Sequence, residues 1–144
     1  MSQYRKELIN GLEWFYKNKA NEKSVVEGKG YVIIKAEESV RDGMIGTLVS
    51  MICKSNMYIE GTVVMALAHT LGDETKVSCR ISGFKDRGID LRELIKDILK
   101  KAGNGTGGGH KLAAGAVIPQ DDEERFVEIA QQILAKKAQE ETII

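Results

Sequence analysis

One stretch of the chain combines residue types that bind anions: three consecutive glycines followed by a histidine and a lysine, Gly107 to Lys111. Glycine has no Cβ, so consecutive backbone amides can converge on one point, and the side chains of His110 and Lys111 add charge-assisted donors. A glycine run that leads into a helical turn would aim its free N–H groups at such a ligand, and a phosphate suits several converging donors. The alternative is a flexible surface loop with an incidental histidine. The segment by itself therefore predicts either a phosphate cradle or a linker.

A second candidate, Arg80, lies where polar and apolar residues alternate, from Thr75 to Ser82. This alternation is typical of a strand with one polar face, so Ser78 and Arg80 share a face. If that face lies near the glycine segment, the planar guanidinium adds bidentate recognition of the same phosphate. We therefore expect Arg80 to be a principal contact, with Ser78 and Lys111 in auxiliary positions.

Residues for catalysis by this chain alone are scarce. The sequence has two histidines, His69 and His110, and no HExxH metal site, GxSxG nucleophile or P-loop. The carboxylates at 121–124 resemble metal ligands, but their place before a helix favours interaction with the helix dipole. We expect no catalytic residue and no metal ligand here; a small phosphatase with a metal on Asp121, Asp122 and His110 is the weakest alternative.

Composition limits the class of protein. A chain of 144 residues, 42% of them hydrophobic and 29% charged, fits one globular domain. The 21 basic and 21 acidic side chains balance, so any nucleic-acid binding depends on a local patch. Cys53 and Cys79 fit reduced core residues, and without an apolar span or a signal peptide the expected compartment is the cytoplasm, with no membrane partner.

Hydrophobic periodicity predicts the elements that must position these residues. In chain order they are an amphipathic helix including Leu8 to Tyr16, a strand at Tyr31–Lys35, a helix capped by Asp42, two strands at Thr62–Leu71 and Thr75–Ser82, a helix from Asp90 to Gly103, a short strand at Ala116–Ile118 and a last helix after Glu124. This order predicts an α/β single domain: a mixed sheet of about four to five strands with helices packed on it. Residues 1–24 either pack on that domain or form a connector from a preceding one.

The two candidate sites together carry a family resemblance. The pattern SxR at 78–80 followed by GGGHxxAAG at 107–115 resembles the DHH-associated carboxy-terminal domain (DHHA type 1) of DHH-family phosphoesterases, over about residues 25 to 138. Gly103 to Lys111 and Ala116 to Pro119 are most similar to the archaeal RecJ-like single-strand exonucleases. The resemblance implies that Gly107, Gly108, Gly109 and His110 hold a phosphate of a nucleotide or single-stranded nucleic acid, and that Arg80 grips the same strand.

The resemblance also implies what is missing. In the family, hydrolysis occurs at a manganese or magnesium centre on a separate amino-terminal domain named after its Asp-His-His motif, and this chain has no such motif. Residues 25–144 are then the substrate-binding part of a phosphodiesterase, inactive alone, and the helix of residues 1–24 either packs on this part or is a connector from the missing DHH domain. The rival interpretation is a non-catalytic interaction module that docks a replication, repair or translation protein.

Overall fold

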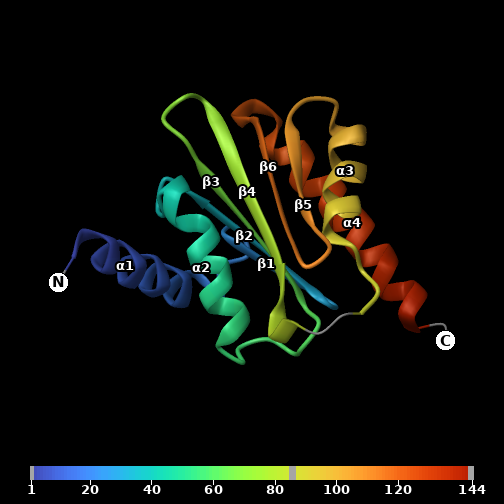
Figure 1. Ribbon diagram of the computed structural model, residues 1–144, viewed down its shortest axis with the longest axis horizontal. Helices are drawn as coiled ribbons and strands as arrows, with labels where there is room; N and C mark the ends of the chain where they lie inside the picture. The colour runs from blue at the N-terminus through green and yellow to red at the C-terminus, as the bar shows by residue number, and fades with distance from the viewer. Residues whose placement is uncertain (1, 85–86, 143–144) are drawn as a thin grey trace.

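The computed structural model describes residues 2–84 and 87–142, which form helices on both faces of one sheet (Figure 1). The elements are α1 (Gln3–Asn18), β1 (Val25–Gly28), β2 (Tyr31–Glu37), α2 (Asp42–Lys54), β3 (Val63–His69), β4 (Glu74–Ile81), η1 (Ser82–Phe84), α3 (Leu91–Ala102), β5 (Thr106–His110), β6 (Ala113–Pro119), η2 (Gln120–Asp122) and α4 (Glu123–Thr142).

The sheet has six strands in the order β1-β2-β3-β4-β6-β5. Strands β2 and β3 pair in parallel, with α2 as the crossover between them, and the other four pairings are antiparallel. The predicted α/β class and mixed sheet are confirmed, although six strands replace the four to five expected. The additional strands are β1 and β5, the two edges of the sheet, which are short and lack a clear hydrophobic alternation.

Two hydrophobic cores lie on opposite faces of this sheet. One face packs against α2 and α1, where Phe15, Ile45 and Leu48 are fully or almost fully buried. The other face packs against α3 and α4, with Leu94 and Phe126 among its buried residues. Helix α1 therefore packs on the same domain, and Figure 1 shows it on the side of the molecule away from α3 and α4.

Local signals for the helices were mostly correct. The Asp90 carboxylate accepts hydrogen bonds from the backbone N–H groups of Arg92 (3.0 Å) and Glu93 (3.3 Å), and Gly103 ends α3 with a φ of 95°. The expected cap at Asp42 is wrong, because Arg41 is the N-cap residue and makes no side-chain cap bond. Asp42 instead occupies the first turn of α2, where its charge interacts favourably with the helix dipole.

The helices leave part of one sheet face uncovered. Helix α2 contacts β3 and β4, whereas α3 contacts β5 and β6 from the opposite face. On the α2 side, β5 is fully exposed and the outward residues of β6, Ala113, Gly115 and Val117, are partly exposed. We call this surface of β5 and β6, together with the partly exposed outward residues of β4 beside α2, the open face.

Candidate functional site

The glycine segment is a strand, which corrects the expectation of a helical turn. Residues Thr106–His110 form β5, which among the described strands pairs with β6 alone, and the hairpin turns at Lys111 and Leu112. The Ala116–Ile118 strand expected next begins earlier, at Ala113, because it continues this hairpin. In an antiparallel edge strand the N–H groups point alternately toward the neighbour and away from the sheet. The glycine amides that point away from β6 therefore line a sheet edge rather than converge on one point.

The three glycines of this strand have different neighbours. A Cβ at Gly107 would lie 2.7 Å from the Gly115 carbonyl oxygen and 2.8 Å from Cγ2 of Ile95, so this glycine lets β5 pack closely on α3. Gly109 has a φ of 141°, which a residue with a side chain rarely adopts. A Cβ at Gly108 would meet nothing within 4 Å, because Gly108 faces the open side. Of the three, Gly108 is the one that adds bare backbone to the open face.

Strand register places Arg80 and His110 in one row of the open face. Arg80 pairs with Ala113 of β6, and Ala113 pairs with His110 of β5. Directly paired residues share a sheet face, and two strand spacings separate the backbones of β4 and β5 by about 10 Å. Both side chains are long enough to reach a group of phosphate size above Ala113. The separate predictions for Arg80 and His110 thus fall at one place in the structure.

The neighbouring row completes the floor of the site. Ser78 pairs with Gly115, which pairs with Gly108. This row has one hydroxyl beside two glycines. Because the glycines have no side chains, a ligand can approach the backbone closely there. Helix α2 borders the row, since a Cβ at Gly46 would lie 3.5 Å from the Ser78 hydroxyl oxygen.

Arg80 is available for an incoming anion. Its side chain is partly exposed, and it forms no hydrogen bond or ion pair with the residues that the structure describes. Burial raises the pKa of the nearby Cys53 thiol to about 11, although the positive charge of Arg80 acts in the opposite direction. A neutral thiol does not neutralise the guanidinium, so Arg80 keeps its charge and its donors for a phosphate.

Helix α3 holds the turn that follows His110. The backbone N–H of Leu91, the first residue of α3, donates a 2.8 Å hydrogen bond to the carbonyl oxygen of Lys111. The exposed Lys111 and His110 are thereby tied to the capped end of a helix. The site accordingly rests on regular elements, which limits the motion of its side chains.

The alternative metal site is not formed. Among the described residues, no group of three histidine, cysteine or acidic side chains is placed to hold a metal ion. Asp121 and Asp122 follow the far end of β6, which its seven residues place about 20 Å from the end that pairs with His110. Asp122 instead accepts a 3.3 Å hydrogen bond from the Asn104 amide. The carboxylates are at the start of the last helix, as predicted.

His69 has a structural environment that the sequence did not reveal. Its Nδ1 lies 2.9 Å from Oε1 of Glu38, and its Nε2 lies 3.0 Å from Oε1 of Glu123, which also accepts a hydrogen bond from the Thr75 hydroxyl. Burial lowers the pKa of His69, but the bond to Glu38 and the charges of both carboxylates outweigh it and hold the pKa above its usual value. This cluster is at the opposite end of the β3–β4 pair from Arg80, so it stabilises the fold outside the open face.

The fold and the site define a DHHA1 domain. The DHHA1 family model matches residues 28–136, and the chain belongs to this family. It is 30% identical over 138 residues to the uncharacterized protein MJ0831 of Methanocaldococcus jannaschii, covering 94% of this chain but 27% of that protein. The chain thus spans about a quarter of the length of this curated relative.

Two solved structures share the fold. The C-Ala domain of Aquifex aeolicus alanyl-tRNA synthetase has a TM-score of 0.61 and 18% identity, covering 77% of this chain and 97% of that one. The pGpG-specific phosphodiesterase PggH of Vibrio cholerae has a TM-score of 0.54 and 18% identity, covering 90% and 41%. The fold is therefore that of a domain found in both proteins. Among the described residues, no helix combines the length and apolar character needed to cross a bilayer.

Proposed function

We propose that this chain is the substrate-binding domain of a RecJ-like DHH phosphoesterase and that its open face holds a phosphate of a nucleotide or single-stranded nucleic acid. The observation that carries the proposal is the single row formed by Arg80, Ala113 and His110 across three strands. The names of the two solved neighbours, a pGpG phosphodiesterase and a tRNA synthetase domain, point to the same class of ligand.

The chemistry of recognition follows from the residues of the row. The Arg80 guanidinium donates two parallel hydrogen bonds to phosphate oxygens, and the His110 ring donates a third from the facing strand. Ser78 and Lys111 lie next to these residues in auxiliary positions, and the glycine backbone lets the phosphate approach the sheet. The chain binds and orients the ligand by these contacts.

Bond cleavage belongs, in this proposal, to a separate DHH domain in a longer protein. That domain would hold manganese or magnesium ions, which stabilise the developing charge during phosphodiester hydrolysis. The open face would then keep one end of the substrate in place while the scissile bond lies at the metal centre. We expect the chain alone to hydrolyse no oligonucleotide, with or without manganese.

A titration tests phosphate recognition. We expect the chain to bind a 5′-phosphorylated oligonucleotide more tightly than the same oligonucleotide without the phosphate, and R80A or H110A to remove the difference. R5A is a matched control, because Arg5 is an exposed arginine on α1, away from the open face. Equal binding of both oligonucleotides, unchanged by R80A and H110A, would contradict the proposal.

The surface chemistry of the chain bears on the rival interpretation, an interaction module. A module of that kind needs an exposed apolar patch, for which the first helix offers Trp14 and Phe15. In the structure Phe15 is fully buried and Trp14 is partly buried against the α1–α2 core. The open face, in contrast, presents a cation, a histidine and a hydroxyl. Its chemistry favours an anionic ligand over an apolar protein surface.

A further inference from the structure

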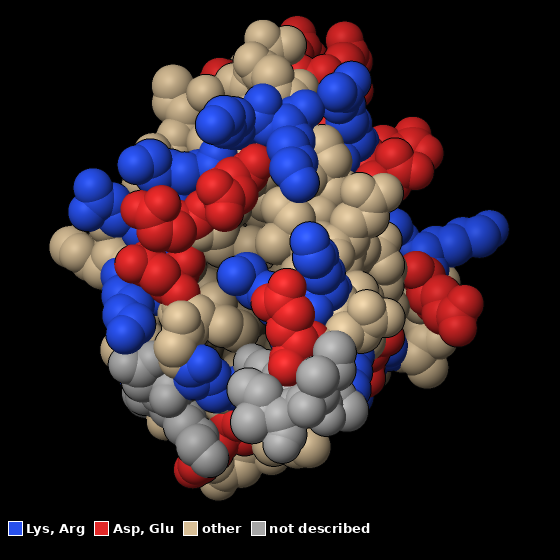
Figure 2. Space-filling model, turned by 90° about the vertical axis from the view of Figure 1, so that its right-hand side faces the viewer, with Lys and Arg blue, Asp and Glu red and all other residues tan. Residues whose placement is uncertain are grey.

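A basic groove lies between α3 and α4, on the face of the sheet opposite Arg80. Its volume is about 630 Å³, and four lysines line it, Lys100 and Lys101 from α3 and Lys136 and Lys137 from α4, together with two carboxylates, Asp97 and Glu140. Figure 2, which views this side of the molecule, shows lysine and arginine side chains gathered around a hollow with carboxylates between them. The lining therefore has an excess of two positive charges.

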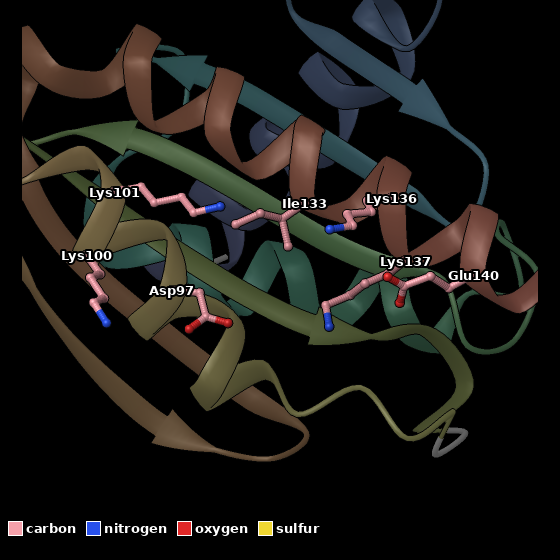
Figure 3. A pocket seen from close by; sticks show the side chains of 7 residues that line it. All are labelled: Asp97, Lys100, Lys101, Ile133, Lys136, Lys137 and Glu140. Atoms are coloured by element: carbon pink, nitrogen blue, oxygen red, sulfur yellow. The ribbon is translucent and has the colours of Figure 1, made fainter.

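The lysine ammonium groups of this groove lack anionic partners. In the two described segments of the chain, none of the four forms an ion pair with a carboxylate. Figure 3 shows Lys101 and Lys136 pointing toward each other from the two helices, with Ile133 between them. Like charges placed together at a surface repel each other and lower the stability of the fold unless an anion lies between them. The arrangement suits an anionic ligand that lies along the helices.

The groove is continuous with the free edge of the glycine strand. A second hollow, of about 660 Å³, lies between α3 and β5 and is lined by Gly105, Thr106 and Gly107 on one side. Asp97 and Lys100 line both hollows, so one surface runs from β5 across α3 to α4. The next residue of β5, Gly108, presents bare backbone with nothing within 4 Å of a Cβ there, so an extended chain can cross this edge close to the backbone.

We propose that the basic groove binds the phosphate backbone of single-stranded nucleic acid beyond the nucleotide held at Arg80 and His110. This inference rests on the proposed function, because it is the continuity with that site that favours nucleic acid over an acidic polypeptide. No aromatic side chain lines either hollow, so the contact is to phosphates and is independent of base sequence. The groove lengthens the footprint from a nucleotide to a strand.

Dependence on strand length and on salt tests this inference. With a 5′-phosphorylated strand of about 12 nucleotides, the double variant K101Q/K136Q should reduce the magnitude of the slope of log affinity against log salt by about 1.4. Each phosphate that a lysine neutralises on a single strand contributes about 0.7 to this slope. With a 5′-phosphorylated dinucleotide, which is too short to reach α4, the same variant should bind as the parent chain does. K6Q/K17Q is the matched control, because both lysines are exposed on α1.

The outcomes separate the two proposals. An unchanged slope for the longer strand, while R80A still weakens dinucleotide binding, would overturn the groove and leave the phosphate site intact. A loss of dinucleotide binding in K101Q/K136Q would also overturn it. The two lysines would then affect the nucleotide held at Arg80 and His110 and not a more distant part of the strand. Lysine-dependent binding of poly-glutamate as tight as that of the oligonucleotide would assign the groove to acidic polypeptides. Loss of phosphate dependence throughout would contradict the proposed function instead.

Discussion

Arg80 and His110 lie on either side of the same residue, Ala113, in one row across β4, β6 and β5. They are 30 positions apart in sequence, and a helix separates them. Because both residues lie in this row, their side chains can donate hydrogen bonds to one ligand above Ala113.

The first prediction concerns the shape of the Arg80 side chain. R80K keeps the positive charge but loses the planar pair of donors, so we expect about 10-fold weaker binding of a terminal phosphate, and up to about 100-fold for R80A. The melting temperature should stay nearly unchanged in both variants, because Arg80 has no hydrogen-bond or ion-pair partner among the described residues. Calorimetric titration and thermal unfolding measure the two effects. Full affinity in R80K would argue against bidentate recognition.

The second prediction separates two adjacent glycines. G107A places a methyl group against the Gly115 carbonyl oxygen and Ile95, so we expect it to lower the free energy of unfolding by about 1–3 kcal/mol. G108A adds the same group where nothing lies within 4 Å and should change it by no more than about 0.5 kcal/mol. Denaturant unfolding of the two variants provides the comparison. Similar destabilisation by both variants would show that Gly107 and Gly108 do not face opposite sides of the sheet.

The third prediction concerns the cap of α3. D90A removes the acceptor for the N–H groups of Arg92 and Glu93, and we expect a loss of about 1 kcal/mol of stability. D90N is the control, since asparagine caps helices about as well as aspartate. Because the next residue, Leu91, binds the Lys111 carbonyl, hydrogen exchange at the turn after His110 should also increase in D90A. Unchanged exchange there would mean that α3 does not restrain the turn.

The fourth prediction concerns pH. The pKa of His69 is raised in the folded state, so the stability contributed by the protonated ring is complete below about pH 6.5 and is lost as the pH rises through the folded value. The hydrogen bond from His69 lowers the pKa of Glu38 in the folded state. The stability that the Glu38 carboxylate contributes is therefore present above its usual pKa and is lost as the pH falls through its folded pKa. We expect the melting temperature of the parent chain to decline relative to that of H69Q between about pH 6 and 8. If the melting temperatures of the parent chain and H69Q changed in parallel with pH, the ion pairs of His69 with Glu38 and Glu123 would not contribute to stability.

Much of the fold was predictable because its signals are local. The strands at Thr62–Leu71 and Thr75–Ser82 were predicted, the first as a buried apolar run and the second from its alternating polarity, and the structure confirms them as β3 and β4. The α3 helix was predicted from its cap and its glycine stop. The edge strands β1 and β5 were missed, since four or five residues with glycine or polar side chains have no periodic signal. Their structure depends on pairing with β2 and β6, which local sequence does not encode.

The sequence by itself determined the residue types of the candidate site, the membership of the DHHA1 family and the position of Arg80 on the polar face of a strand. Only the tertiary structure decided that the glycines form an edge strand, that Gly107 and Gly108 face opposite sides, and that His110 lies in the row of Arg80. The physical reason is register: strand pairing between distant segments is set when the chain returns after α3, and a shift by one residue would move every side chain of β5 to the other face.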